Sequence, residues 1–226
     1  MFSLLFSMFN NISQLVMSAV ITLIALTFHE LAHGWVSMKL GDPTPRIQGR
    51  MTLNPLAHLD PIGTILMVLT GFGWAKPVEV NPMYYKDRKK GMALVGIAGP
   101  ITNFLLAIIG VVIWIIPFAT ATAANWNLPI FFARGYSSFM YLFVFRNLCF
   151  MVFNLIPIPP LDGSRVIGMF LKNSAYYKLM SYERYSFFLI LILSLTGVFD
   201  SIIGTGVNFF FNLILGTVMR ILGILV

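Results

Sequence analysis

The sequence predicts an all-α polytopic membrane protein with about five full transmembrane helices, one re-entrant or short segment and a small membrane-associated β element. Two observations predict this class. Of the 226 residues, 58% are hydrophobic and 10% are charged, an apolar excess that a water-soluble fold of this size cannot bury. The apolar residues also gather in runs that reach the roughly 20 residues needed to cross a bilayer. Because no polar stretch is long enough to form a soluble module, we expect a single membrane domain over residues 1–226.

The first third of the chain contains three kinds of segment. An apolar run over residues 12–40 predicts the first span, and the Gly-Asp-Pro sequence that follows it is a typical helix end. Residues 44–60 are rich in Pro, Asn and Gly and predict a loop. Residues 61–74 are apolar but short for a full crossing, which favours a re-entrant segment. Residues 75–82 alternate apolar and polar side chains between prolines, as an edge strand does.

Apolar runs dominate the rest of the chain. Four of them predict further full spans, at residues 92–118, 136–156, 185–199 and 202–222. We expect the last two to be separated by a break at Asp200 and Ser201. The domain then consists of a core over about 12–170 and C-terminal helices over about 185–223.

The basic residues predict the orientation of the chain. Eight Lys and Arg residues lie between residues 39 and 90 and four between 165 and 184, whereas the loop 118–135 contains only Arg134. If residues 61–74 enter the membrane and return, both basic groups lie on one side, which the positive-inside rule makes cytoplasmic. We therefore expect a multi-pass protein of the cell membrane with its N-terminus outside. The net charge of +7 then reflects these loops and does not indicate nucleic-acid binding.

The first span contains the sequence His29-Glu30-Leu31-Ala32-His33. On a helix this spacing places both imidazoles on one face, where they can bind one zinc ion with Glu30 beside it as a candidate general base. The alternative is a pair of buried histidines in a helix bundle. That alternative leaves Glu30 without a role at a depth where an ionisable group costs about 2.5–3.5 kcal/mol. We therefore predict one zinc ion per chain, held at membrane depth near the cytoplasmic side.

A catalytic zinc site of this kind needs a third protein ligand. Asp162 is the best candidate because it closes the run 154–163, where three prolines in four positions break the helix and Gly163 frees the backbone. The alternative is an Asp that caps a Pro-Gly turn. Asp60 and Asp200 are weaker candidates. The remaining four acidic residues are expected in solvated loops: Asp42, Glu79, Asp87 and Glu183.

Taken together, these motifs resemble the site-2 protease family of intramembrane zinc metalloproteases. The resemblance rests on the motif at 29–33, on the pattern N-x-x-P-x-x-x-x-D-G from Asn154 to Gly163, and on the sequence G-P-I-T-N at 99–103 in the intervening span. The three motifs occur in the family's order. The absence of PDZ-like or CBS-like insertions in these 226 residues resembles the minimal prokaryotic branch of the family.

The resemblance implies a three-helix catalytic core and a role for each motif residue. His29, His33 and Asp162 are the implied zinc ligands, and Glu30 is the implied base that activates water. Asn154 is implied to orient the substrate or to stabilise the oxyanion.

The function we predict is that of an intramembrane zinc metalloendopeptidase, which hydrolyses peptide bonds in or near transmembrane segments of membrane proteins, as in regulated intramembrane proteolysis. The expected partners are such transmembrane substrates and the lipid bilayer; the sequence does not define an oligomeric state. Because a transmembrane substrate must unwind, the strand-like residues 76–81 are a candidate for holding it by edge pairing. A ZIP-like zinc transporter is one alternative, but only His58 is left as a further histidine. A catalytically inactive scaffold is another, but a scaffold needs no Glu30.

One span carries small residues at helical spacing. The stripe consists of Gly96, Gly99, Asn103, Ala107 and Gly110. Small residues allow helices to approach closely in lipid, so we expect this stripe to receive the motif helix, with Asn103 available for a cross-helix hydrogen bond.

Two further residues have open interpretations. His58 is either a loop histidine bonded to Asp60 or to the backbone, or a functional residue near the water entrance. Arg146 lies inside a predicted span, where it either faces a cavity or pairs with a carboxylate.

Overall fold

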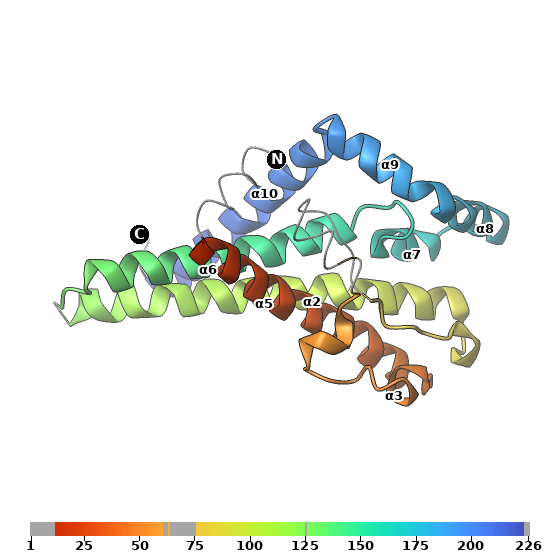
Figure 1. Ribbon diagram of the computed structural model, residues 1–226, viewed down its shortest axis with the longest axis horizontal. Helices are drawn as coiled ribbons and strands as arrows, with labels where there is room; N and C mark the ends of the chain where they lie inside the picture. The colour runs from red at the N-terminus through yellow and green to blue at the C-terminus, as the bar shows by residue number, and fades with distance from the viewer. Residues whose placement is uncertain (1–11, 61–62, 64–75, 125, 224–226) are drawn as a thin grey trace.

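A computed structural model describes residues 12–60, 63, 76–124 and 126–223 of the chain, which form a bundle of helices (Figure 1). Among these described residues, four helices are long and apolar enough to cross a membrane. These are α2 (Ile12–Lys39), α5 (Arg88–Ala123), α6 (Ile130–Asn154) and α10 (Val198–Ile221). The predicted class, a helical multi-pass membrane protein, is therefore confirmed.

Short helices connect the four long ones. They are α3 (Thr44–Ile47), η1 (Pro55–His58), η2 (Pro82–Tyr84), α7 (Asp162–Gly168), α8 (Asn173–Ser181) and α9 (Glu183–Leu195). Local sequence sets where several helices begin. Asn54 and Asn81 cap η1 and η2, and Asp87 caps α5 by accepting hydrogen bonds from the next turn's N–H groups.

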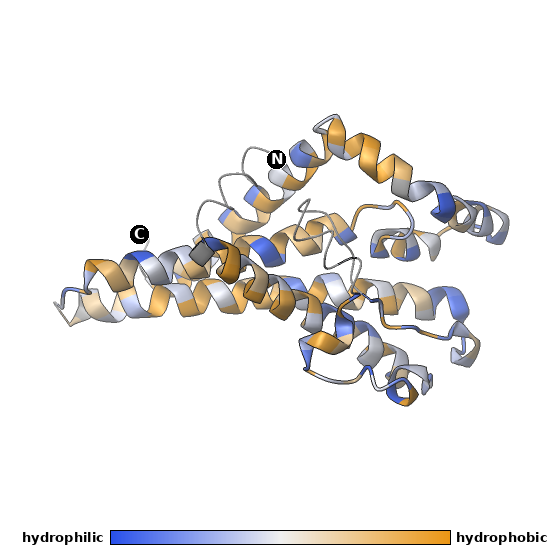
Figure 2. Cartoon of the chain, viewed as in Figure 1, coloured by the Kyte–Doolittle hydropathy of each residue, from blue (hydrophilic) through white to orange (hydrophobic). Residues whose placement is uncertain are grey.

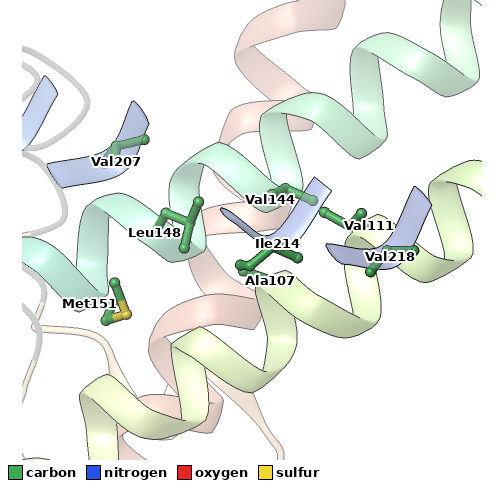
Figure 3. Packing of buried hydrophobic residues seen from close by; sticks show 8 residues of the cluster. All are labelled: Ala107, Val111, Val144, Leu148, Met151, Val207, Ile214 and Val218. Atoms are coloured by element: carbon green, nitrogen blue, oxygen red, sulfur yellow. The ribbon is translucent and has the colours of Figure 1, made fainter. Parts of the chain in front are cut away.

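Helices α2, α5 and α6 pack against one another, and α10 lies against α6 and α5. In Figure 1, α5 and α6 run side by side along the long axis of the molecule, and α2 crosses them. Figure 3 shows the apolar cluster that joins α5, α6 and α10. Its fully buried members are Ala107, Val111, Val144, Leu148 and Val207. This cluster fixes the position of α5 and α6, which carry the residues that surround the motif on α2.

The predicted fifth span is not confirmed. Residues 185–199 fall mostly in α9, which has 13 residues and is therefore about 20 Å long, shorter than the roughly 30 Å hydrocarbon core. The predicted break at Asp200 and Ser201 is wrong, since both residues lie inside α10. The chain turns instead at Gly197, whose φ of 75° lies in the left-handed region that favours glycine.

The predicted β element is not confirmed either, because residues 76–81 are extended but form no strand among the described residues. The predicted re-entrant segment at 61–74 lies outside the described residues, apart from Gly63.

The outer surface of the bundle is strongly apolar. Figure 2 shows hydrophobic residues along the long helices and over most of α9, with hydrophilic residues concentrated in the short connecting elements. Large side chains such as Phe131 and Leu195 are 93% and 72% exposed. Exposure on this scale is expected where lipid covers the helices.

Candidate metal centre

The motif on α2 places its two histidines side by side, as the spacing predicts. The rings of His29 and His33 are 4.6 Å apart between centroids, in an edge-to-face arrangement. Both are buried, with 3% and 6% of their surface exposed. Two imidazoles one helical turn apart therefore face the same point inside the bundle.

Asp162 reaches the histidine pair from a distant part of the sequence. Helix α6 ends at Asn154, the proline-containing run follows, and α7 begins at Asp162, so the predicted helix break is present. Oδ2 of Asp162 lies 3.1 Å from Nε2 of His29 and 3.2 Å from Nε2 of His33. The Asp162 side chain is 8% exposed.

The three donor atoms form a site that fits a single metal ion. Among the described residues, His29, His33 and Asp162 are the group whose ligand atoms lie within 4.8 Å of one another. In a tetrahedral zinc site, ligand distances near 2.0–2.1 Å place neighbouring donor atoms about 3.3–3.5 Å apart. The measured separations from Asp162 are close to that value. Two imidazoles and one carboxylate are also a common donor set in catalytic zinc sites.

The second nitrogen of each ring explains why a cation fits here. Nδ1 of His29 lies 2.6 Å from Oδ1 of Asn103, and Nδ1 of His33 lies 2.7 Å from the carbonyl oxygen of Val95. Because both partners are acceptors, each Nδ1 carries a proton, and the Nε2 atom of each ring faces the Asp162 carboxylate. Oδ2 of Asp162 lies 3.1 and 3.2 Å from the two Nε2 atoms, so either a proton on Nε2 or a metal ion must lie between these atoms.

A second amide fixes Asn103 in this orientation. Nδ2 of Asn103 donates to the carbonyl oxygen of Ala25 on α2 at 3.1 Å and to Oδ1 of Asn147 on α6 at 3.0 Å. Nδ2 of Asn147 in turn donates to the carbonyl oxygen of Phe143 at 2.8 Å. Asn103 and Asn147 are both fully buried. The predicted cross-helix hydrogen bond of Asn103 is therefore present, and it connects all three core helices.

The small-residue stripe on α5 serves three partners, not only the motif helix. A Cβ at Gly99 would overlap the ring of His29, so this glycine allows α2 to approach. A Cβ at Gly96 would lie 3.1 Å from the carbonyl oxygen of Asp162, on α7. One at Gly110 would lie 2.9 Å from Phe143 on α6. The stripe follows the helical twist, so different members face different neighbours.

Glu30 contacts the extended residues 76–81. Its Oε2 accepts a hydrogen bond of 2.8 Å from the backbone N–H of Val78, and the Glu30 side chain is 9% exposed. Lys76 N–H donates to the carbonyl oxygen of His58 at 3.0 Å, and Asn81 N–H donates to Asp42 at 2.7 Å. Three backbone N–H groups thus hold the extended segment in place, and one of them, that of Val78, binds the candidate base on α2.

Asp42 does not lie in a solvated loop as predicted; it is 1% exposed. Its carboxylate accepts hydrogen bonds from Ser37 Oγ, Thr44 N and Asn81 N at 2.7–2.9 Å, which join the end of α2 to the 76–81 segment. Burial would raise the pKa of this carboxyl, but the hydrogen bonds outweigh burial and hold the pKa below its ordinary value. The prediction failed because Asn81, one of these partners, lies far from Asp42 in the sequence, on the extended segment that packs over it.

Asn154 is not brought into contact with the histidine pair. It is the last residue of α6, and its Nδ2 donates to the carbonyl oxygen of Phe150 in its own helix at 3.1 Å. The weaker ligand candidates are also apart from the cluster: Asp200 is exposed on α10, and Asp60 accepts from Gly63 N at 2.7 Å.

The two residues with open interpretations are both placed by the structure. His58 is fully buried, and its Nε2 lies 2.9 Å from the carbonyl oxygen of Thr52, which favours the structural interpretation of a backbone-bonded loop histidine. Arg146 donates from Nη2 to Ser18 Oγ at 2.7 Å, so its observed partner is a hydroxyl and not a carboxylate.

The sequence prediction missed three groups that surround the site. The Val95 carbonyl and the Val78 N–H are backbone groups, which no sequence motif reveals. Asn147 did leave a signal, because an amide inside an apolar span needs a partner, and Asn103 was the other buried amide available.

Fold and site together define a helical multi-pass membrane protein with a candidate mononuclear metal site of two histidines and one aspartate. The chain belongs to peptidase family M50, the site-2 protease family, because the model of that family matches residues 17–196.

Named relatives agree with this assignment. The chain is similar to YwhC of Bacillus subtilis, provisionally named a zinc metalloprotease, with 42% identity over 178 residues that cover 78% of this chain and 80% of YwhC. It is also similar to Rip2 of Mycolicibacterium smegmatis, likewise provisionally named a zinc metalloprotease, with 27% identity over 77% of this chain and 64% of Rip2. The zinc metalloprotease MJ0392 of Methanocaldococcus jannaschii is 28% identical over 76% of this chain and 39% of its own length. The chain thus spans less than two thirds of the latter two relatives. No solved structure matches the chain.

Proposed function

We propose that this protein is an intramembrane zinc metalloendopeptidase that cleaves peptide bonds in or near transmembrane segments of other membrane proteins. The observation that carries the proposal is the convergence of two histidine Nε2 atoms and the Asp162 carboxylate inside a bundle of helices that are long and apolar enough to cross a membrane. A buried glutamate beside that point completes the groups that a metallopeptidase needs.

His29, His33 and Asp162 are the proposed ligands of one zinc ion. When bound, zinc supplies Lewis acidity, which polarises a carbonyl and lowers the pKa of water. Asn103 and the Val95 carbonyl orient the two rings by holding their Nδ1–H groups. Held in this way, the rings lose little conformational freedom when they bind an ion.

Glu30 is the proposed general base and acid. Val78 N–H holds Oε2, which leaves Oε1 as the oxygen that accepts a proton from the attacking water and passes it to the leaving amine. A single hydrogen bond to Oε2 fixes the rotamer of the carboxylate without occupying both oxygens. In this proposal the extended residues 76–81 position the general base Glu30, in addition to any pairing with the substrate.

Asn154 is proposed to orient the substrate or to stabilise the developing oxyanion. Its amide hydrogen bond to Phe150 lies within its own helix, so the amide would exchange this bond for one to the substrate at the start of the unwound stretch.

The cytoplasmic side is proposed to be the one that carries the ends of α2 and α6 and the start of α5. Arg88, Lys89 and Lys90 begin α5, and Lys39 ends α2, which agrees with the positive-inside rule. The N-terminus is then outside, and the site opens toward the cytoplasm.

Replacement of Glu30 by Gln tests the proposal. The purified Glu30→Gln variant should retain its zinc while cleavage of a membrane-spanning reporter in liposomes falls by at least about 1,000-fold, since the proton acceptor is lost. Glu183→Gln, at the exposed start of α9, is the matched control and should cleave at the wild-type rate. Wild-type protein that contains zinc but cleaves no transmembrane reporter, or a Glu30→Gln variant that cleaves normally, would contradict the proposal.

A further inference from the structure

Arg146 is a basic residue inside the membrane-spanning helix α6, and the proposed catalytic mechanism assigns it no role. It lies on α6, eight residues before the end of that helix. Its Nη2 donates to Ser18 Oγ on α2, and its Nε is buried without a hydrogen-bond partner. No carboxylate among the described residues forms an ion pair with it. A guanidinium has five N–H donors in a fixed fork, and within the described part of the chain the Nε donor of Arg146 has no acceptor.

An arginine side chain inside a membrane raises the free energy of the folded protein unless a partner compensates its charge. Ionisable residues in transmembrane segments usually pair with another group or mark the path of a ligand. Asn103 and Asn147, which are fully buried, have all their amide groups paired, whereas the partly buried Arg146 does not have all its N–H donors paired. Among the residues that the structure describes, Thr27 Oγ1 and His58 Nδ1 are also buried without a hydrogen-bond partner, but of these three groups only Arg146 is a guanidinium. Its positive charge points to a partner with acceptor oxygens.

The depth of Arg146 excludes a lipid headgroup as the simplest partner. At 1.5 Å per residue, Arg146 is about 12 Å from one end of α6 and about 24 Å from the other. Its side chain reaches away from the nearer end, toward Ser18 in the first half of α2. A partner at that depth must come from within the hydrocarbon region, as a side chain of another transmembrane segment does.

A pocket of about 430 Å³ lies at the same end of the α2–α6 contact. Gln14 and Met17 line it from α2, and Arg134 and Ser138 line it from α6. Ser18 directly follows Met17 and is one helical turn from Gln14, so the Arg146–Ser18 pair lies next along α2 toward the metal site. The pocket adds polar groups and a second cation, Arg134, beside the contact between the two helices.

We propose that Arg146 binds an acidic side chain, Asp or Glu, of a transmembrane substrate that lies against the face between α2 and α6. This inference rests on the proposed protease function and names a class of substrate for it. Ser18 is 11 residues before His29, a distance of about 16 Å along α2. The substrate's acid is therefore about 11 residues from the cleaved bond if the substrate is helical between them. It is about five residues away if the substrate is extended.

Binding to the Glu30→Gln protein tests this inference without requiring catalysis. The ligands are fluorescent single-span peptides in liposomes, each with Glu, Gln, Leu or Lys at one test position. A series of peptides places this position from five to 11 residues away from the bond expected to be cleaved. We expect the Glu peptide to bind at least about 10-fold more tightly than the Leu peptide at one spacing, and Arg146→Met to remove this difference. Arg146→Glu should reverse the preference, so that the Lys peptide binds best. Arg220→Met, the same substitution near the end of α10, should leave the Glu preference unchanged.

The outcomes separate this inference from its rivals. Equal affinity for Glu and Leu peptides at every spacing would overturn it, as would an Arg146→Met variant that weakens all peptides alike while remaining folded. A third outcome is that the effect of Arg146→Met on peptide binding requires anionic lipid and does not change with the peptide's charge. That result would show that Arg146 binds a lipid phosphate, and it would also overturn the inference. Charge-dependent binding with no cleavage by the wild-type protein would refute the protease function but support the role of Arg146 in binding acidic transmembrane segments.

Discussion

Helices α5 and α10 both cross the bundle and both contain glycines and asparagines in an apolar sequence, but these residues do different things in the two helices. In α5, Gly99 lies against the His29 ring and Asn103 is fully buried with every amide group paired. In α10, a Cβ at Gly216 would meet nothing within 4 Å, and Asn208 is exposed. The structural role of a small or polar residue in a membrane helix therefore depends on which element the residue faces.

The largest expected effect comes from adding a methyl group to α5. In Gly99→Ala the new Cβ overlaps the His29 ring, so α2 must move and the donor atoms separate. Displacement of a ligand by about 1 Å is sufficient to reduce activity by about 100-fold or more. Zinc affinity, measured by competition with a chelating dye, should fall in parallel. Gly216→Ala makes the same change on α10 and should leave both quantities unaltered; equal behaviour of the two variants would refute the comparison.

Removal of the Asn103 amide should have the next largest effect. Asn103→Leu takes away the acceptor that fixes the His29 ring, and loss of such a partner typically reduces metal affinity by about 10–100-fold. The matched variant on α10 is Asn208→Leu, which places an apolar side chain on an exposed position. We expect its zinc affinity to equal that of wild type in the same titration. An Asn103→Leu protein with unchanged affinity would mean that packing alone orients His29.

Asn147 acts one hydrogen bond further from the site, so its effect should be smaller. Asn147→Leu removes one of the two acceptors of Asn103 Nδ2, and cross-helix hydrogen bonds of this kind contribute about 0.6–1.7 kcal/mol. The expected loss of zinc affinity is therefore about 3–20-fold. In the double variant with Asn103→Leu, the second substitution should add little, because both act through one chain of bonds. Fully additive losses would show that Asn147 acts independently of Asn103.

Asp42 tests the polar network at the end of α2 and should have the least effect on the metal itself. Because its pKa is lowered in the folded protein, its ionised form stabilises the fold at neutral pH, and this contribution is lost as the pH falls below the ordinary carboxyl value of 3.8. Asp42→Asn should reduce the free energy of unfolding by about 1–3 kcal/mol at pH 7 and weaken its dependence on acid. Chemical denaturation in detergent from pH 3 to pH 7 measures both. The exposed Asp200→Asn on α10 should change stability by no more than about 0.5 kcal/mol.

Much of this arrangement follows from the sequence because apolar runs predict spans and the two zinc motifs predict a shared site. The spacing of His29 and His33 places both rings on one face of α2, and the proline-containing run delivers Asp162 at the start of α7. Local patterns did not predict the length of α9, since the left-handed turn at Gly197 and not the polar pair after it ends the apolar run. They also missed the burial of Asp42, which depends on contacts between separate stretches of the chain. No sequence motif could predict the role of the Val78 N–H, because every residue except proline has a backbone N–H.

The metal content of the purified protein tests the central claim most directly. The account predicts one zinc ion per wild-type chain by mass spectrometry of the metal. In Asp162→Ala, zinc should be lost or held at least about 100-fold more weakly, while Asp200→Ala should retain the full content. Wild-type protein with no zinc after purification without chelators, or an Asp162→Ala variant that binds zinc as tightly as wild type, would contradict the account.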